Sequence, residues 1–382
     1  MTRVLPGKTI GILGGGQLGR MMALAAREIG YRTAVLEPKA DSPAAQVADQ
    51  EVISDYNDLD GAKKLAHSSD VVTYEFENID STVASWLEEH ADFPQGSDLL
   101  AISQDRLQEK KAIRSFGVSI APYREVNTEK DLKKATDELG FPCVLKTTRG
   151  GYDGKGQAVL NEQGDIREAW ERLKQNGPFV LEAWIPFEKE LSVIVTRSVS
   201  GETTVFPVAE NVHRNNILHQ TIVPARTSYR VQEEAVLLAR KLAESFHLVG
   251  TLAVEMFLTK DDVLYVNELA PRPHNSGHFT INACDTSQFE QHIRAVCDLP
   301  LGKTDLLKPV VMVNILGEHV PRILEKLDEF PTAHLHLYGK EEAKPGRKMG
   351  HLTILGEDTN RILENIHSSS IWREQEAMEA NR

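Results

Sequence analysis

The chain contains 382 residues, of which 41% are apolar and 26% are charged, the balance of a soluble globular protein with two or three domains. Lys and Arg number 43 against 56 Asp and Glu, a net charge of −13, and no basic block stands out. Because binding to nucleic-acid phosphates depends on clustered Lys and Arg, this composition argues against a nucleic-acid partner. The sequence has no evident signal peptide, no run near the ~20 apolar residues of a membrane span, and three cysteines without metal-like spacing, so we expect a cytoplasmic protein.

The first hundred residues alternate short β-like runs with helical patterns, an order that predicts a parallel sheet with right-handed crossovers. The expected strands are Ile10–Leu13, Thr33–Leu36 and Val71–Tyr74, and the expected helices are Gln17–Ile29 and Ala62–Ala66. Pro94-Gln95-Gly96-Ser97 then interrupts the pattern. We therefore predict an N-terminal parallel α/β domain over residues 1–100.

From about residue 120 to 295, longer strands separated by turns predict an α+β body with antiparallel hairpins. The expected strands are Cys143–Thr147, Phe179–Ile185, Glu190–Ser198, Thr203–Glu210, Thr251–Leu258 and Val263–Leu269. The expected helices are Asp105–Phe116, Thr128–Leu139, Asp165–Gln175 and Val231–Phe246. We predict a second domain over residues 101–298 and a small mixed α/β domain over residues 299–382, whose last dozen residues are polar and expected to fray.

The segment Gly14-Gly15-Gly16-Gln17-Leu18-Gly19 fits the pattern G-x-G-x-x-G between a strand and a helix. Its glycines let backbone amides approach an anion at a helix N-terminus, where the helix dipole favours negative charge. Glu37 ends the next strand, 18 residues after Gly19, where dinucleotide-binding folds place a ribose-binding acid. This segment alone is consistent with an NAD-dependent dehydrogenase, although any phosphate-bearing ligand uses the same physics.

A second glycine-rich segment is more specific. The strand that ends at Lys146 runs into the segment 150–157, with the sequence Gly-Gly-Tyr-Asp-Gly-Lys-Gly-Gln. So many glycines cannot form the interior of a helix or strand, so we predict a flexible flap. The flap amides and Lys155 can fold over a polyphosphate beside Lys146, whereas the alternative is a hairpin tip with a solvated lysine.

Two glutamates in the last hairpin of the α+β body indicate a cation site. If a two-residue turn at Asp261-Asp262 joins the two strands, Glu255 and Glu268 face each other on one side of the sheet. Directly opposed carboxylates repel each other, and a cation or a shared proton relieves the repulsion. Hard oxygen ligands suit Mg²⁺, or Mn²⁺ in its place, with substrate phosphates and Asn267 as further oxygen donors. The alternative is an exposed hairpin with two solvated glutamates.

This order of lysine-tipped strand, glycine flap, Glu182-Ala183-Trp184-Ile185 segment and paired-glutamate hairpin resembles the ATP-grasp superfamily. The resemblance implies an ATP-grasp fold with a Rossmann-like pre-ATP-grasp domain before it and a flap subdomain at about residues 120–186. It also implies that Glu182 and the backbone of residues 182–185 meet the adenine, and that Glu190 meets the ribose. The other ATP contacts that it implies are Arg106, Lys146, Gly151, Tyr152, Asp153, Gly154, Lys155, Gly156, Gln157, His213, Asn267 and Glu268.

Further strings stand in the order of one family within this superfamily. They are Gly-Gly-Gly-Gln-Leu-Gly-Arg-Met (14–21), Thr-Tyr-Glu-Phe-Glu-Asn (73–78), Ser-Gln-Asp-Arg (103–106), Ala-Pro-Arg-Pro-His-Asn-Ser-Gly-His (270–278), Ser-Gln-Phe-Glu-Gln-His (287–292) and Pro-Gly-Arg-Lys-Met-Gly-His (345–351). Together they resemble the 5-(carboxyamino)imidazole ribonucleotide synthases of purine biosynthesis over about residues 8–355. The resemblance implies a ligase that makes carboxyphosphate from ATP and bicarbonate and releases ADP and phosphate. The carboxyphosphate carboxylates 5-aminoimidazole ribonucleotide either directly or through released CO₂.

The resemblance also assigns roles around the reacting groups. Arg272 follows the paired-glutamate hairpin within four residues, so its guanidinium can reach bicarbonate or the transferred phosphoryl group. The expected catalytic residues are Arg272, His274, Asn275, Lys155 and Asp153. The expected contacts to the ribonucleotide are Gly15, Gly16, Gln17, Glu75, Tyr152, Asp153, Arg272, Arg347 and Lys348.

Other functions remain open at this point. Formate-dependent glycinamide ribonucleotide transformylase and biotin carboxylase also activate a one-carbon acid with ATP, although the length disfavours the second and the string 73–78 favours the imidazole substrate. A dehydrogenase would bind NAD tightly and have no use for Glu255 or Glu268. A non-catalytic nucleotide-binding protein would bind ATP without turnover. A homodimer is expected from the family resemblance alone.

Overall fold

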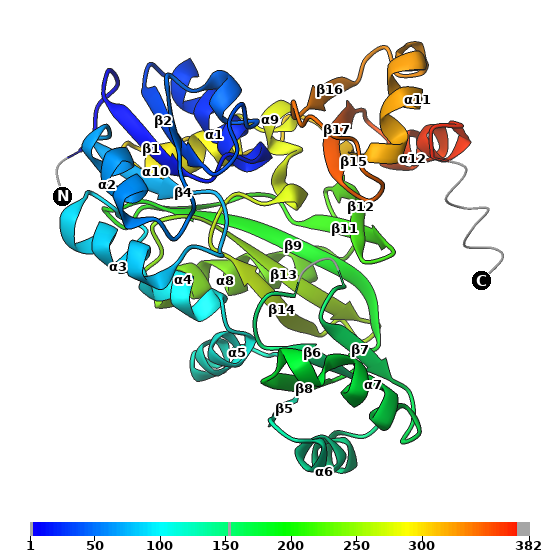
Figure 1. Ribbon diagram of the computed structural model, residues 1–382. Helices are drawn as coiled ribbons and strands as arrows, with labels where there is room; N and C mark the ends of the chain where they lie inside the picture. Colours follow the sequence, from blue (N-terminus) through cyan, green and yellow to red (C-terminus); the bar gives the residue numbers. More distant parts are fainter. Residues whose placement is uncertain (1–2, 152–153, 373–382) are drawn as a thin grey trace.

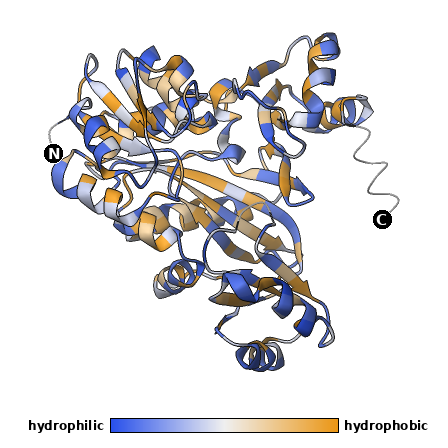
Figure 2. Cartoon of the chain, viewed as in Figure 1, coloured by the Kyte–Doolittle hydropathy of each residue, from blue (hydrophilic) through white to orange (hydrophobic). Residues whose placement is uncertain are grey.

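The computed structural model of this chain describes residues 3–151 and 154–372 (Figure 1). Within these ranges the strands form three sheets, of which one is parallel and two are antiparallel. The parallel sheet lies at the upper left of Figure 1 and the small antiparallel sheet at the bottom, with the long strands of the third sheet between them. Figure 2 shows apolar residues concentrated along the strands and hydrophilic residues on the outer faces of the helices. The predicted combination of a parallel α/β domain with an α+β body is confirmed.

The N-terminal sheet has the strand order β3-β2-β1-β4, with every pair parallel. Its strands are β1 (Thr9–Leu13), β2 (Arg32–Glu37), β3 (Gln50–Ile53) and β4 (Val71–Tyr74), and its helices are α1 (Gln17–Glu28), α2 (Leu59–His67) and α3 (Ser81–His90). Sequence analysis missed the edge strand β3, because three of its four residues are exposed and it lacks an apolar run. After α3, the short helix α4 (Asp98–Ser103) and then α5 (Arg106–Ser115) lead into the next layer.

The small antiparallel sheet has the order β5-β8-β6-β7 and carries the lysine-tipped strand. Its strands are β5 (Tyr123–Val126), β6 (Cys143–Thr147), β7 (Gln157–Leu160) and β8 (Phe179–Ala183), and its helices are α6 (Glu129–Leu139) and α7 (Asp165–Leu173). Helix α6 begins at a capping box, in which Thr128 and Asp131 satisfy each other's backbone amides. Both helices pack their apolar side chains on one face of the sheet, so its other face is left for the cavity described below.

The third sheet has the order β14-β13-β9-β11-β12-β15-β17-β16, with β10 paired to β9. Its strands are β9 (Phe187–Arg197), β10 (Thr203–Val205), β11 (Ala209–Arg214), β12 (Ile217–Val223), β13 (Gly250–Thr259), β14 (Leu264–Ala270), β15 (Val310–Leu316), β16 (His334–Leu337) and β17 (Lys348–Leu355). The C-terminal strands therefore continue the sheet of the central body, since β12 pairs with β15. The helices are α8 (Tyr229–Ser245), α9 (Thr280–Ala283), α10 (Gln288–Val296), α11 (Val320–Glu325) and α12 (Thr359–Ser368). The boundaries near residues 100 and 298 stay predictions.

The expected single strand Thr203–Glu210 is wrong, because two strands occupy this part of the chain. Strand β10 ends at Val205 and β11 starts at Ala209, and both pair with β9. Pro207 lies between them, and a proline has no N–H for the ladder. The chain therefore leaves the sheet for three residues and then returns to the same neighbour.

The turn of the paired-glutamate hairpin is one residue longer than expected. Thr259 donates its amide to the carbonyl of Val263 at 3.1 Å, so residues 260–262 form a three-residue loop. Its last residue, Asp262, has a φ of 58°, as such a loop requires. The pairing then shifts by one residue at a bulge, because β14 has one extra residue, 267, where β13 passes directly from Met256 to Glu255. This shift offsets the longer turn and restores the pairing of Glu255 with Glu268. The predicted pair is therefore present, although the predicted turn is wrong.

Helix α10 joins the layer of the parallel sheet to the large sheet. Its apolar residues Phe289 and Ile293 share a core with α1, and the helix lies beside α1 and β1 in Figure 1. Its fully buried His292 accepts a hydrogen bond at Nδ1 from the amide of Thr251 at 3.1 Å. The other ring nitrogen, Nε2, therefore carries the hydrogen and donates it to Thr73 of β4 at 2.7 Å. One side chain thus fixes the parallel sheet against β13.

Two further features of the fold concern its helices and its cysteines. In the part of the chain that the structure describes, every helix is too short or too polar to cross a membrane. Cys143, Cys284 and Cys297 are all buried and free. Burial raises the pKa of the Cys143 thiol to about 11, so this thiol stays protonated near neutral pH.

Leu242→Ala and Leu237→Ala on α8 test where the core lies. Leu242 is fully buried in the core beneath the large sheet, whereas Leu237 is 64% exposed. We expect the Leu242 variant to lose about 2–5 kcal/mol of unfolding free energy, because it leaves a cavity. The Leu237 variant should change by less than about 0.5 kcal/mol. Urea unfolding followed by circular dichroism measures both, and equal losses would contradict this packing.

Candidate active site

A cavity of about 630 Å³ opens between the small sheet, the β13–β14 hairpin and the loop that follows β14. Most of the predicted ATP and catalytic residues line it. They are Arg106, Lys146, Gly151, Gly154, Lys155, Gln157, Glu182, Ala183, Trp184, Ile185, Glu190, His213, Glu255, Asn267, Glu268, Arg272, His274, Asn275 and Lys348. The predicted residues that do not line it are Gly15, Gly16, Gln17, Glu75, Gly156 and Arg347. Tyr152 and Asp153 lie outside the described residues.

Two carboxylates, Glu255 and Glu268, sit directly opposite each other on the hairpin. Burial and the charge of Glu268 raise the pKa of Glu255. Loss of water also favours the neutral form of Glu268, but Arg106 and Lys146 outweigh this and lower its pKa. Asn267, the extra residue of the bulge, precedes Glu268, and its buried Oδ1 has no hydrogen-bond partner among the described residues. Two carboxylates and one unsatisfied amide oxygen fit a hard divalent cation.

A buried ion cluster joins β6 and β8, on which Lys146 and Glu182 are diagonal neighbours. Glu182 is 3.1 Å from the ammonium group of Lys146 and 3.1 Å from that of Lys110. Burial would raise the pKa of Glu182, but the two lysines outweigh it and lower the pKa to about 2. Burial also lowers the pKa of Lys146. With both lysines protonated, the cluster carries one more positive than negative charge, which favours an anionic ligand.

Arg106, at the start of α5, connects three parts of the site. Its guanidinium lies 3.2 Å from Glu268 of the hairpin and donates to the carbonyl of Gly151 in the flap at 3.1 Å. One turn later, buried Glu109 accepts the amide of Leu269, next to Glu268, at 2.5 Å. Burial, and then the charge of Glu268, raise the pKa of Glu109 to about 8. Helix α5 thus binds two groups of the hairpin: the carboxylate of Glu268 through Arg106, and the backbone amide of Leu269 through Glu109.

The opposite wall carries the predicted ribose residue. Glu190 of β9 forms an ion pair with His213 of β11. Burial disfavours the charged imidazole, but the contact with Glu190 outweighs it and raises the pKa of His213. Near the outer rim, the ring of Phe187 stacks on Phe257 with centroids 4.5 Å apart, and Trp184 is 42% exposed. An apolar rim above a polar wall suits a ligand with a flat base and a polar sugar.

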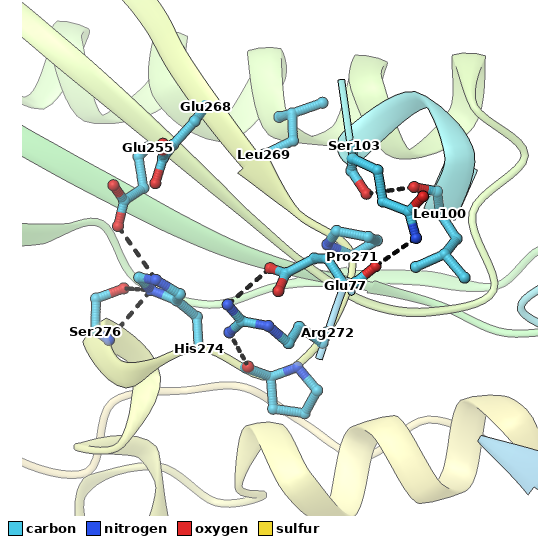
Figure 3. A network of polar contacts seen from close by, with 12 residues as sticks. Glu77, Leu100, Ser103, Glu255, Glu268, Leu269, Pro271, Arg272, His274 and Ser276 are labelled. Carbon is cyan, nitrogen blue, oxygen red and sulfur yellow. Dashed lines mark hydrogen bonds and ion pairs between the residues drawn. The ribbon is translucent and has the colours of Figure 1, made fainter. Parts of the chain in front are cut away.

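The loop after β14 carries Arg272 and His274, as Figure 3 shows. Arg272 contacts Glu77 from the N-terminal domain at 2.7 Å. His274 accepts the amide of Ser276 at Nδ1, so its Nε2 carries the hydrogen and points toward Glu255 at 3.4 Å. Burial and the nearby charge of Arg272 lower the pKa of His274 well below its ordinary value. His274 is therefore a neutral hydrogen-bond donor in this state.

Asn275, which was expected to be catalytic, is held by the C-terminal strands. Its amide donates to Asn314 of β15 at 3.0 Å and its Oδ1 accepts from Asn314 at 2.6 Å. Asn314 also donates to the carbonyl of Leu218 on β12 at 2.7 Å. A reciprocal amide pair of this kind fixes the loop, although Asn275 still lines the cavity. Its catalytic role stays a prediction.

The glycine loop binds carboxylates of the chain itself. The amides of Gly16 and Gly19 donate to buried Glu75, and the amide of Gly15 donates to Glu37 at 2.8 Å. Burial raises the pKa of Glu75 despite these amides. A pyrophosphate would have to displace both acids, which contradicts the dehydrogenase interpretation. The expected contacts of Gly15 and Gly16 with the ribonucleotide stay predictions, and they require the amides to exchange partners.

The expected basic pair is split. Lys348, at the start of β17, lines the cavity, whereas Arg347 is exposed and donates to the carbonyl of Glu342 at 3.0 Å. Arg347 precedes β17 and lies in a turn in which its own amide donates to the carbonyl of Lys344 at 3.0 Å, so it stays outside the strand. Lys348 thus supplies positive charge to the cavity, and the contact of Arg347 with the ribonucleotide stays a prediction.

Sequence reasoning missed Glu77, Glu109 and Lys110. The signal for the last two was available, because 106, 109 and 110 share a helical face with Ile113, which is fully buried. Charged residues at core-facing positions of a helix indicate a buried polar site. Glu77 stands two residues after Glu75 beyond the carboxyl end of β4, where parallel sheets place ligand contacts.

Comparisons with known proteins show which family the chain resembles along its length. Family models described as a ribonucleotide synthetase preATP-grasp domain, an ATP-grasp domain and a phosphoribosylaminoimidazole carboxylase C-terminal domain match residues 7–104, 111–289 and 310–365. The N5-carboxyaminoimidazole ribonucleotide synthase of Bacillus subtilis is 56% identical over 95% of each chain. A solved ADP complex of an N5-carboxyaminoimidazole ribonucleotide synthetase is 60% identical, with a TM-score of 0.96 over 98% of this chain and 100% of that one. The Aspergillus clavatus N5-carboxyaminoimidazole synthase, solved with ADP and 5-aminoimidazole ribonucleotide, is 34% identical, with a TM-score of 0.86 over 94% and 96%.

Glu109→Gln tests the charge state of this buried carboxyl group. The folded pKa of about 8 exceeds the ordinary value of 4.5, so between these two pH values the unfolded chain ionises while the folded chain stays protonated. Wild-type stability from this group is present below pH 4.5 and is lost as the pH rises through 8. Glutamine is neutral throughout and keeps the acceptor for Leu269. We expect the melting temperature of the variant, relative to wild type, to rise steadily from pH 5 to pH 8.5.

Thermal unfolding at a series of pH values measures this difference. The matched control is Glu171→Gln, because the Glu171 side chain is 58% exposed and forms an ion pair with Lys174, three residues later. A difference for Glu109→Gln that does not change with pH would contradict a protonated Glu109.

Proposed function

The chain belongs to the ATP-grasp family of N5-carboxyaminoimidazole ribonucleotide synthases, and from this membership we propose that it carboxylates 5-aminoimidazole ribonucleotide with bicarbonate and ATP in purine biosynthesis. The observation that carries the proposal is the meeting of two elements in one cavity. These are the opposed pair Glu255 and Glu268 and the loop with Arg272 and His274. The first suits a triphosphate and the second a small acid that receives its phosphoryl group.

ATP lies along the cavity between the rim and the hairpin. The adenine occupies the apolar rim near Trp184, with Glu190 near the ribose. Lys146 and Arg106 contact the phosphates, since both are cations at the cavity wall and both lie close to acidic partners that a phosphate can replace. Lys155 in the flap covers the phosphates from the other side.

Mg²⁺ is part of this proposal, and Glu255 and Glu268 would hold it together with Asn267. When bound, it neutralises charge on the phosphates during transfer. The support is the unsatisfied Oδ1 of Asn267 and the raised pKa of Glu255, because both are relieved by a cation. In the described part of the chain, no three acidic, His or Cys side chains gather as a metal site, so phosphate oxygens complete the ligand set.

The chemistry runs in two transfers. An oxygen of bicarbonate attacks the γ-phosphorus of ATP, the bond to the bridging oxygen breaks, and ADP leaves behind carboxyphosphate. The exocyclic amine of the ribonucleotide then attacks the carboxyl carbon, the bond to the phosphate oxygen breaks, and inorganic phosphate leaves as the amine loses a proton. Arg272 holds bicarbonate and the phosphate formed from it, and His274 donates a hydrogen bond from Nε2.

The ribonucleotide lies toward the N-terminal domain. Arg272 contacts Glu77 there, so its guanidinium stands where the two domains meet. Lys348 supplies positive charge for the ribonucleotide phosphate from the C-terminal side of the cavity. Glu75 stands at the carboxyl end of β4 and is a further expected contact of the ribonucleotide. We also propose that the enzyme is a cytoplasmic homodimer, for which family membership is the support.

ADP release with each pairing of acid and amine tests the proposal. Bicarbonate or formate is combined with 5-aminoimidazole ribonucleotide or glycinamide ribonucleotide. We expect fast release only with bicarbonate and the aminoimidazole, because the site is built for that pair. Equal release with all four pairs, or fastest release with formate and glycinamide ribonucleotide, would reject the proposed substrates.

Glu268→Gln tests the role of the acidic pair. Turnover should fall by at least about 100-fold, because a charged group at the transferring phosphoryl is lost. ADP binding and the melting temperature show whether the variant is folded. Removing divalent cations with EDTA should abolish wild-type turnover, and adding Mg²⁺ should restore it. A wild-type rate in the variant, or full turnover in EDTA, would remove the metal assignment.

A further inference from the structure

Gln288, the first residue of α10, is fully buried and binds both backbone groups of His274. Its Oε1 accepts the amide of His274 at 2.9 Å, and its Nε2 donates to the carbonyl of the same residue at 2.7 Å. The carboxamide therefore bonds both the N–H and the carbonyl of one loop residue, and we call this pair of hydrogen bonds the clamp. No role for Gln288 follows from the resemblance or from the reaction described above.

The orientation of this carboxamide is fixed by its partners. A backbone N–H can only donate and a backbone carbonyl can only accept, so the oxygen and nitrogen of Gln288 cannot exchange places. The second hydrogen on Nε2 is directed at Nδ1 of His278, 3.2 Å away. Gln288 thus uses its oxygen and both of its amide hydrogens on the segment 274–278.

Close packing holds the other side of the clamp. A Cβ atom built on Gly277 would lie 2.4 Å from the Oε1 of Gln288, so only glycine leaves room for the carboxamide. The backbone N–H of Gln288 itself donates to the hydroxyl oxygen of Thr280 at 2.9 Å. Helix α10 is in turn fixed between α1 and β13 by its apolar face and by His292. Gln288 therefore fixes the position of His274 relative to α1 and β13.

A second glutamine on the same helix makes the same kind of clamp elsewhere. Gln291 is also fully buried, and its Oε1 accepts the amide of Gly302 at 2.8 Å while its Nε2 donates to the carbonyl of Gly302 at 2.7 Å. Gly302 does not line the cavity. The two glutamines are thus matched in burial and bonding, and they differ in whether the clamped residue faces the reacting groups.

We propose that Gln288 is a positioning residue for the carboxylation, which sets the place of His274 and, two residues earlier, of Arg272. This inference rests on the proposed function. Without the clamp, two partly buried backbone groups of His274 lose their partners, and the loop moves to find others. A displacement of about 1 Å at a reacting group can cost on the order of 100-fold in rate. The ATP phosphates are bound by other elements, so the affinity for ATP should be unaffected.

Gln288→Met and Gln291→Met form the test, because methionine keeps the length of the side chain without its hydrogen bonds. Both variants should lose similar thermal stability. We expect Gln288→Met to lower kcat by about 10- to 100-fold, with the KM for ATP within about 2-fold of wild type. Gln291→Met should keep a kcat within about 2-fold of wild type. Each enzyme is assayed with the acid and amine pair that wild type turns over.

Gly277→Ala is the second variant, since its Cβ displaces the carboxamide without removing it. It should reproduce the fall in kcat, and it decides the question if Gln288→Met does not fold. The inference is overturned if Gln288→Met or Gly277→Ala keeps a wild-type kcat, if both glutamine variants lose kcat equally, or if the KM for ATP rises as much as kcat falls. Failure of the proposed function would show separately, as a lack of wild-type turnover with bicarbonate and the aminoimidazole ribonucleotide.

Discussion

Two like charges held side by side are the constraint around which this site is built. The pairing of β13 with β14 fixes Glu255 opposite Glu268, and an uncompensated pair of carboxylates at that spacing is unfavourable. Arg106 offsets the charge of Glu268, and Glu255 is left to be neutralised by a proton or a cation. In the proposed function a divalent cation with its phosphates would replace the proton on Glu255, so the geometry that raises the pKa of this carboxyl group would also favour the metal.

The remaining charges form an alternating network across the cavity. Glu182 is shared between Lys110 and Lys146, and Arg272 is paired with Glu77. In the proposed function, cations that are now paired with carboxylates of the chain would take anions of the substrates as partners. Such a network keeps buried charges compensated before binding, at the cost of breaking some contacts when the substrates arrive. Neutral His274 adds a hydrogen-bond donor without adding charge to a region that already holds several cations.

Much of this architecture could be read from the sequence, and the failures have definite physical causes. Periodicity located α5, α6 and three of the four strands of the parallel sheet, because local propensity decides them. The hairpin register was correct only because a longer turn and a bulge cancel, and neither leaves a mark in the pattern of apolar residues. The glycine loop fitted an anion site, but sequence spacing could not reveal that Glu75 and Glu37 already occupy its amides. The pairing of Asn275 with Asn314 joins residues far apart in the chain, which a motif cannot disclose.

The shared sheet has a consequence for how the chain can be divided. Strand β12 bonds β15 along four residue pairs, and Asn314 on β15 holds the loop that carries His274. A fragment that stops before β15 would expose the unpaired edge of β12, a template for association with other chains. It would also release the loop from its contact with Asn314. The C-terminal strands are therefore a structural part of the reaction centre, and they cannot be exchanged as an independent module.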